Sequence, residues 1–369
     1  MKINGYFSCH KTTAIAPYIH MTIDDPKSII VRMPNWLGDA VMATPVLKDL
    51  RERFPEAKLT AMCIKSVGEI LKWDPNLDEL FIFHRPSGWL HRQAHRDIIA
   101  PLRHGDYDLG ILLTNSLSSA WWFWRGWVKK RLGYRGNFRT ALLTHPVSFP
   151  ANKETQHLVT TYKMLVEPLG IPVSDTDPKL YLSESEKGEA EQLLAKYGIK
   201  KEDTVIGVNP GAAYGSAKCW PKEYFIELTH LLMENPSYKV VYFGDPSGAS
   251  LVESICYDMP DRVINLAGKT NIRELLALIN ACTVFLTNDS GPMHIAAALG
   301  KPLLALFGST STIKTGPYKQ GDVIKKDVSC SPCYLRTCPI DFRCMKSIKP
   351  AEVYSLLNNI LAKKSHMRP

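Results

Sequence analysis

The chain has 369 residues, of which 45% are hydrophobic and 22% charged, and this length and composition suit two globular domains rather than one. No stretch approaches the roughly 18 consecutive apolar residues of a membrane-spanning helix, so a spanning protein is not expected. The net charge of +9 is concentrated in residues 1–170, which hold 22 Lys and Arg against 15 Asp and Glu. A basic half of this kind favours contact with an anionic surface.

Residues 1–27 form an extension that precedes the first strand pattern. They lack the basic start and apolar core of a secretory signal, so we expect the protein to work in the cytosol. Met21 is an alternative to Met1 as the start of translation. Nine cysteines in a large chain without an export pattern indicate reduced thiols rather than a disulfide framework.

Residues 28–170 alternate short apolar runs with longer amphipathic ones, which is typical of repeated β-α units in a parallel sheet. The expected strands are SIIVRM, KLTAMCI, LFIF and LGILLTN, and the expected helices span residues 40–53, 66–73, 89–103 and 116–128. Pro45 lies inside the first helical run and has no amide donor. We therefore expect a kink there, or a restart with Thr44 as the cap.

The alternation weakens over residues 171–203, which are rich in turn formers and predict a linker region. It restarts over residues 204–350, and residues 351–369 predict a C-terminal helix and tail. The expected fold class is therefore α/β, with two doubly wound domains. Ligands of such sheets collect outside the carboxyl ends of the strands. Four polar loops fall there, namely the turn at Asp39 and residues 209–218, 243–248 and 288–294.

Two of these loops suit a phosphate group. The loop NPGAAYGSAK consists largely of small residues and carries Lys218, so backbone amides and an ammonium can approach an anion. In TNDSGPMH, residues Asp289, Ser290 and Gly291 open a helix whose N-terminus favours negative charge. The alternatives are a solvated lysine in the first loop and ordinary capping by Asp289 or Ser290 in the second. Capping does not account for His294 in the same turn.

Asp39 follows a glycine and precedes an amphipathic run, so it is either a helix cap or a catalytic base. Its position at the end of a strand, facing the phosphate loops, favours the base. P-loop ATPases and dinucleotide enzymes are disfavoured. The stretch VINLAGKT has Val263 where a P-loop needs glycine, and no G-x-G-x-x-G motif follows a strand.

Residues 121–139, WWFWRGWVKKRLGYRGNFR, combine tryptophans and cations without one acid. Aromatic rings suit a membrane interface and cations suit phosphates, so this basic aromatic segment predicts contact with an anionic surface such as a membrane. Some of the tryptophans could instead belong to the core. The candidate contact residues are Trp121, Trp122, Arg125, Lys129, Lys130, Arg131 and Arg135.

A second cluster, CSPCYLRTCPIDFRC, has the spacing C-x2-C-x4-C-x5-C. Four thiols within a short loop suit a structural zinc or an iron-sulfur cluster, and the alternative is a loop of reduced cysteines. The loop lies outside the β-α core, so any metal is expected to be structural. The cysteines are Cys330, Cys333, Cys338 and Cys344.

Several stretches taken together resemble the ADP-heptose:lipopolysaccharide heptosyltransferases, glycosyltransferase family 9. They are NWLGDAVMATPVLKDLRERFPEA, NSLSSAWWFWRGWVKKRLGYRGNFRTALLTH, PGAAYGSAKCWP, NLAGKT and NDSGPMHIAAALGKPLLALFGSTS. The motifs follow the family's order over residues 29–362, and within the family the likeness is to the members that add the second heptose of the inner core. The resemblance implies a GT-B fold, with an N-terminal domain for the lipid A-linked acceptor and a C-terminal domain for ADP-heptose. It also implies an inverting reaction that requires no cofactor, at the cytoplasmic face of the inner membrane.

By the same resemblance, Asp39 matches the family's catalytic base and Lys218 its diphosphate-binding lysine. The family's acidic ribose contact has only Asp245 as a counterpart. Further donor contacts are matched by Ala213, Tyr214, Thr270, Asp289, Ser290, Gly291 and His294.

Three alternatives remain at this point. Family members that add the first or third heptose differ in the acceptor they use. A sugar-nucleotide epimerase of similar fold would need no lipid acceptor, and the basic aromatic segment disfavours it. A nucleic-acid-binding protein would use the same segment, and we expect no nucleic acid as partner.

Overall fold

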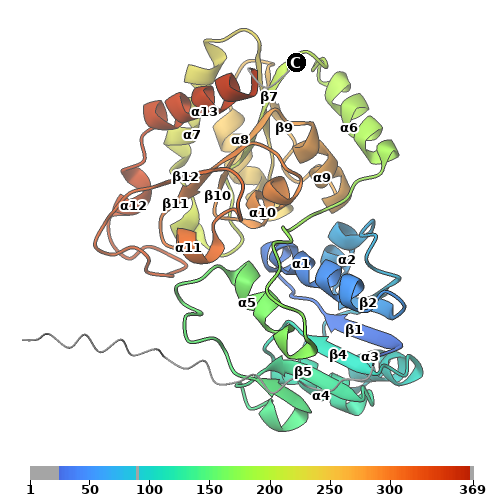
Figure 1. The fold of residues 1–369 in the computed structure, drawn as a ribbon. Helices are drawn as coiled ribbons and strands as arrows, with labels where there is room; N and C mark the ends of the chain where they lie inside the picture. Colours follow the sequence, from blue (N-terminus) through green and yellow to red (C-terminus); the bar gives the residue numbers. More distant parts are fainter. Residues whose placement is uncertain (1–24, 89–90, 366–369) are drawn as a thin grey trace, which may run out of the picture.

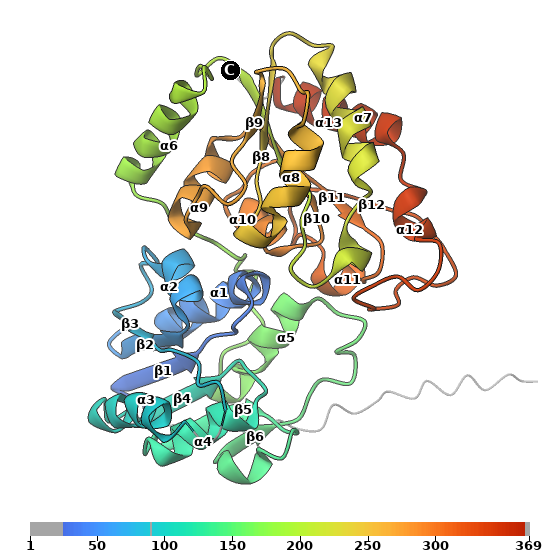
Figure 2. The same ribbon diagram turned by 180° about the vertical axis from the view of Figure 1, so that it is seen from behind.

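The computed structural model describes residues 25–88 and 91–365, so the extension expected at residues 1–27 lies almost entirely outside the described residues. Two α/β domains face each other across one interface, and each contains a parallel six-stranded sheet covered by helices (Figures 1 and 2). The expectation of two doubly wound domains is confirmed.

The first sheet has the strand order β3-β2-β1-β4-β5-β6, and every neighbouring pair is parallel. Its strands are β1 (Ser28–Arg32), β2 (Lys58–Cys63), β3 (Glu79–Ile82), β4 (Leu109–Leu112), β5 (Lys130–Tyr134) and β6 (His145–Val147). The helices of this domain are α1 (Leu37–Arg53), α2 (Lys65–Leu71), α3 (Arg92–His104), α4 (Leu117–Arg125) and α5 (Leu158–Met164).

The second sheet has the order β12-β11-β10-β7-β8-β9 and is also parallel throughout. Its strands are β7 (Thr204–Asn209), β8 (Tyr238–Tyr242), β9 (Val263–Asn265), β10 (Val284–Asn288), β11 (Leu303–Phe307) and β12 (Asp322–Lys325). The accompanying helices are α6 (Glu184–Lys196), α7 (Lys222–Met233), α8 (Ala249–Cys256), α9 (Ile272–Ala281), α10 (Gly291–Ala298), α11 (Thr312–Thr315), α12 (Arg343–Lys346) and α13 (Pro350–Ser365).

Both sheets share one topology, in which the chain order reverses between the first and fourth strands of the domain. The reversal lies between β1 and β4 in the first domain and between β7 and β10 in the second. Crossover helices diverge at such a point and leave a crevice at the carboxyl ends of the two strands. The turn at Asp39 follows β1, and the loops 210–218 and 289–291 follow β7 and β10, so three of the four predicted loops lie at a reversal point. The fourth, residues 243–248, follows β8, beside β7.

Helix α1 continues unbroken through Pro45, so the expected restart with Thr44 as a cap is wrong. Pro45 cannot donate to the carbonyl of Val41, and the Thr44 hydroxyl donates to that carbonyl instead, at 2.8 Å. The same hydroxyl accepts from the backbone amide of Lys179 in the linker, at 3.1 Å. Thr44 therefore supplies a hydrogen-bond donor to the Val41 carbonyl in place of the missing amide of Pro45, and it also attaches the linker to α1.

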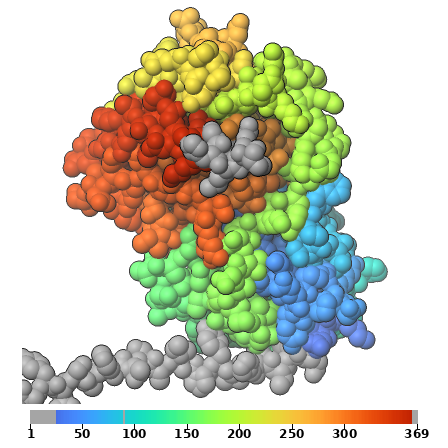
Figure 3. All heavy atoms as spheres, turned by 45° about the horizontal axis from the view of Figure 1, so that its top comes forward, coloured from blue at the N-terminus to red at the C-terminus, as the bar shows by residue number. Residues whose placement is uncertain are grey.

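The two domains meet through apolar contacts as well as polar ones. One continuous cluster of buried residues includes Ala40 and Val41 of α1 together with Met293 and Ile295 of α10. Residues 171–183 cross between the domains without helix or strand, and Figure 3 shows this light-green segment on the surface between them. None of the helices within the described residues is long and apolar enough to cross a membrane.

Candidate active site

The first turns of α1 and α10 lie directly against each other, and each has glycine at the contact. A Cβ on Gly38 would lie 2.7 Å from the Cδ2 atom of His294, and a Cβ on Gly291 would lie 3.3 Å from the Cβ of Leu37. Real Cβ atoms almost never approach another atom as closely as the first of these distances, so a side chain at residue 38 would push the ring away. The two glycines thus bring the start of α1, with Asp39, onto the start of α10.

Asp39 does not cap α1. The N-cap position belongs to Trp36, which makes no side-chain capping bond, and Asp39 lies within the first helical turn. Burial raises the pKa of the Asp39 carboxyl to about 6, although the positive charge of Lys218 lowers it and the negative charge of Asp289 raises it further. A carboxyl with this pKa is ionised at neutral pH and is a stronger base than an ordinary aspartate. The interpretation of Asp39 as a cap is therefore wrong.

Lys218 and Asp289 form the charged pair that faces Asp39 from the second domain. The Lys218 ammonium lies 2.6 Å from the Asp289 carboxylate, and both side chains are largely buried. The hydroxyl of Thr310 donates to the same carboxylate oxygen at 2.6 Å. Asp289 is thus held by two partners and in turn orients the ammonium, which lies above the ring of Tyr214, 4.8 Å from its centroid. The solvated-lysine alternative does not describe this arrangement.

Ser290 occupies the N-cap position of α10 but makes no capping bond, so ordinary capping does not explain this loop either. Its hydroxyl interacts with Thr287 at 2.9 Å and accepts from Asn209 at 3.3 Å. The start of α10 therefore has no side-chain cap, and a helix start of this kind attracts anions. Burial lowers the pKa of His294 to about 4, so its ring is neutral at physiological pH.

Two asparagines at strand ends, Asn209 and Asn288, were not singled out from the sequence. Asn209 donates to the carbonyl of Gly211, and Asn288 donates to the carbonyl of Pro210 while accepting from the amide of Trp220. These bonds join the loop after β7 to the end of β10, so the two predicted phosphate loops are held together as one unit. An asparagine at the carboxyl end of each of two strands is the signal that could have revealed them.

The loop that carries Lys218 is braced by the Cys-rich loop, residues 330–344. The hydroxyl of Tyr214 donates to the carbonyl of Tyr334 at 2.7 Å, and the amide of Ala217 donates to the carbonyl of Arg336 at 2.9 Å. Gly215 has a φ of +155°, and a Cβ there would collide with the Arg336 carbonyl. Only glycine fits that close approach, so the small residues of this loop serve packing as well as access.

The other predicted donor contacts lie around the same edge. Ala213 is exposed, and Thr270 is partly exposed directly before α9, in the loop after β9. That loop is joined to the loop after β8 by the bond from the Gly268 amide to the Gly244 carbonyl, 2.9 Å. The carboxylate of Asp245 accepts from the amide of Gly248 and the hydroxyl of Ser247, both at 2.8 Å. Asp245 thus acts as a local cap, and the structure does not add support for a ribose contact there.

The four cysteines of the Cys-rich loop are free thiols. Burial is the main cause that raises the pKa of Cys344, and the thiols of Cys330, Cys333 and Cys338 raise it further, so the four interact electrostatically. Cys333, however, is exposed. Within the part of the chain that the structure describes, no group of three or more His, Cys, Asp or Glu side chains is arranged to hold a metal ion. The arrangement does not fit a closed metal site, and metal binding stays a prediction.

The basic aromatic segment is divided between core and surface. Trp122 is only 3% exposed and donates from Nε1 to His95 at 2.9 Å, so its assignment to a contact surface is wrong. Lys129 pairs with Asp106 and Asp108, and the Arg131 guanidinium donates to the carbonyls of Val128 and Leu142. These two cations are engaged within the fold. The Lys129 side chain is nevertheless 51% exposed. The other exposed aromatic and basic residues of the segment are Trp124, Arg125, Trp127, Arg135 and Phe138, while Trp121, Lys130 and Arg131 are partly exposed.

Comparisons with known proteins agree with this fold. The model of glycosyltransferase family 9 (heptosyltransferase) matches residues 96–342. Lipopolysaccharide heptosyltransferase 2 of Escherichia coli is 32% identical over 78% of this chain and 85% of its own length. Lipooligosaccharide heptosyltransferase 2 of Campylobacter jejuni is 28% identical over 92% of this chain and 99% of its own length. The structure of E. coli ADP-heptose lps heptosyltransferase II aligns with a TM-score of 0.77 at 29% identity, covering 92% of this chain and 99% of that one.

Proposed function

Because the chain belongs to glycosyltransferase family 9, the heptosyltransferases, we propose that it transfers a heptose from ADP-heptose to the inner core of lipopolysaccharide, as the second heptose added. The observation that carries the mechanism is the position of Asp39. Its carboxyl, with a pKa near 6, lies at the start of α1 opposite the Lys218–Asp289 pair of the other domain. A base and a diphosphate-binding cation thus meet across the domain interface.

In the proposed reaction, Asp39 takes the proton of an acceptor hydroxyl while that oxygen attacks the anomeric carbon from the face opposite ADP. The new glycosidic bond forms as the bond to the diphosphate breaks, which inverts the anomeric centre. Negative charge then grows on the leaving diphosphate. The Lys218 ammonium and the uncapped start of α10 stabilise that charge more in the transition state than in the ground state.

Surface features of the first domain support a lipid-linked acceptor. Trp124 is 46% exposed, Trp127 68% and Phe138 96%, and Arg125 and Arg135 are exposed beside them in sequence. Aromatic side chains suit the membrane interface and arginines suit anionic head groups, so we assign this surface to the anionic face of the inner membrane. We therefore take the exposed tryptophans and arginines as the membrane-contact residues, in place of the larger set of contact residues expected from the sequence.

An acceptor assay tests the function. Purified protein is incubated with ADP-heptose and core acceptors that carry zero, one or two heptoses, and product is detected by mass spectrometry. We expect transfer to the acceptor with one heptose. Transfer only to the bare acceptor, or only to the acceptor with two, would indicate the first or third heptose instead. ADP-heptose turnover without any acceptor would favour an epimerase.

A further inference from the structure

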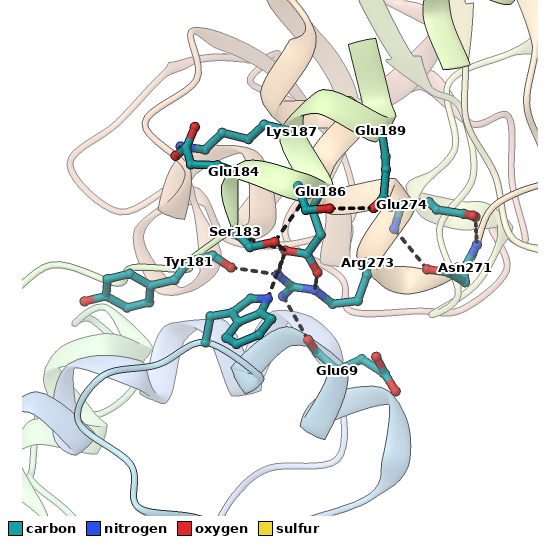
Figure 4. A network of polar contacts seen from close by, with 12 residues as sticks. Glu69, Tyr181, Ser183, Glu184, Glu186, Lys187, Glu189, Asn271, Arg273 and Glu274 are labelled. Carbon is teal, nitrogen blue, oxygen red and sulfur yellow. Dashed lines mark hydrogen bonds and ion pairs between the residues drawn. The ribbon is translucent and has the colours of Figure 1, made fainter. Parts of the chain in front are cut away.

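A buried polar network joins the two domains where the linker enters the second one (Figure 4). At its centre is Arg273 in the first turn of α9, whose side chain is 8% exposed. The guanidinium binds both carboxylate oxygens of Glu186 in α6, at 2.7 Å each. It also donates to the carbonyl of Tyr181 in the linker at 2.9 Å and to the carbonyl of Glu69 in α2 at 3.0 Å. One side chain thus contacts both domains and the segment between them.

Glu186 completes the network. In addition to Arg273, its carboxylate accepts from the amide and hydroxyl of Ser183, at 2.9 and 3.1 Å. It also accepts from Nε1 of Trp73, in the turn after α2 of the first domain, at 2.9 Å. The bond from Arg273 is the largest cause that lowers the pKa of Glu186 to about 2, so this group is ionised throughout the physiological range. A bidentate buried pair with its remaining acceptors filled holds one geometry closely.

The contacts on the other side of the interface have a different character. There Glu154 pairs with Lys314 of α11 at 2.5 Å, but the Glu154 side chain is 65% exposed. His157 donates from Nε2 to the carbonyl of Gly316 at 2.9 Å. In both ribbon views the α1–α10 contact lies between this side and the α2–α9 side (Figures 1 and 2). Exposed ion pairs contribute little stability, so the Glu154–Lys314 pair adds little to this side, which is held by the His157 bond and by the His157 ring against Tyr318, with ring centroids 4.8 Å apart. Of these contacts on the two sides, only Arg273 joins both domains and the linker through one buried side chain.

We propose that Arg273 is a positioning residue for sugar transfer, the fixed point about which the two domains close and which sets Asp39 against the Lys218–Asp289 pair. The proposal rests on the proposed function for its kinetic consequence, but its structural consequence is independent of it. Arg273 lies on neither phosphate loop, so it acts through the relative position of the domains. A displacement of about 1 Å between a base and the reacting centre is enough to lower a rate about 100-fold.

The test compares Arg273→Lys with wild type in the full chain. Lysine keeps the charge but cannot reproduce the planar fork that serves Glu186 and two carbonyls together. We expect kcat to fall at least about 10-fold, ADP affinity to stay within about twofold, and small-angle scattering to show a wider distance distribution. Glu186→Gln, which removes one acceptor and the charge, is expected to change the same quantities in the same direction.

The matched control is Glu184→Gln, which removes an exposed ion pair with Lys187 in α6, the helix that also carries Glu186. It should leave kcat, ADP affinity and scattering at their wild-type values. An Arg273→Lys protein with a lower melting temperature but wild-type kcat and scattering would show that the network is only structural and would overturn the proposal. If wild type transfers no heptose, the proposed function fails, and the scattering and ADP-binding comparison still decides whether Arg273 fixes the domains.

Discussion

Replacing Asp39 by asparagine removes the proposed base and nearly preserves the size of the side chain. If Asp39 is the base, kcat should fall by about 100-fold or more while donor affinity stays near wild type, because the base is used only in the chemical step. The pKa of about 6 adds a pH signature. In wild type, kcat/KM should fall as the pH drops below about 6, since the base becomes protonated, and this acidic limb should be absent from the residual activity of the variant.

The same substitution should stabilise the protein. Burial raises the pKa of Asp39 from 3.8 to about 6, so ionising it in the folded state costs roughly 3 kcal/mol at about 1.4 kcal/mol per pKa unit. The carboxyl is protonated in both folded and unfolded states below about pH 4, so the cost is absent there. It grows as the pH rises through the window between the two pKa values and is complete above the folded one. Asparagine does not ionise, so the folded variant avoids this free-energy cost at every pH.

Asp39 keeps some solvent contact, which reduces the expected gain for Asp39→Asn to about 1–3 kcal/mol at pH 8. With an unfolding entropy of about 2.1 cal/mol/K per residue, this is a rise in melting temperature of about 1–4 °C. Thermal unfolding at pH 4 and pH 8, together with steady-state kinetics, measures both effects. Glu52→Gln is the control, because Glu52 lies in the same helix with a side chain that is 62% exposed. Near-normal turnover of Asp39→Asn would refute the assignment of the base, and an equal melting shift at both pH values would refute the burial argument.

Three further predictions concern the surrounding features. Lys218→Ala should weaken ADP-heptose binding as well as turnover, because the diphosphate loses its ammonium, and calorimetric donor titration that gives wild-type affinity would contradict this role. Replacing Trp124 and Trp127 by serine should reduce co-sedimentation with anionic liposomes at low salt, whereas equal binding would exclude this surface as the docking site. Elemental analysis of protein purified without chelator decides the metal prediction: about one equivalent of zinc or iron is expected for a closed site, and less than about a tenth would leave the Cys-rich loop as a packing element.

Much of the fold follows from periodicity alone. Short apolar runs followed by amphipathic ones predict parallel strands with crossover helices, and helix α10 begins at Gly291, within the segment Asp289–Gly291 that was expected to open a helix. The location of the site follows as well, because loops at the carboxyl ends of strands must share one edge of a sheet. Asp39, Lys218 and the segment from Asp289 to His294 were therefore all identifiable before any contact between them was known.

The sequence by itself determined which residue types stand at which strand ends. Strands and helices show themselves locally, through the spacing of their apolar residues, so their ends can be found without knowing the rest of the fold. Only the tertiary structure decided how those residues pair, since the partners lie far apart in the chain. Lys218 meets Asp289, and Arg273 meets the carbonyl of Glu69, 204 residues away. The same limit explains the error at Trp122. Its spacing is compatible with a surface stripe, but packing against His95 buries it, and burial depends on what the rest of the chain places above a side chain.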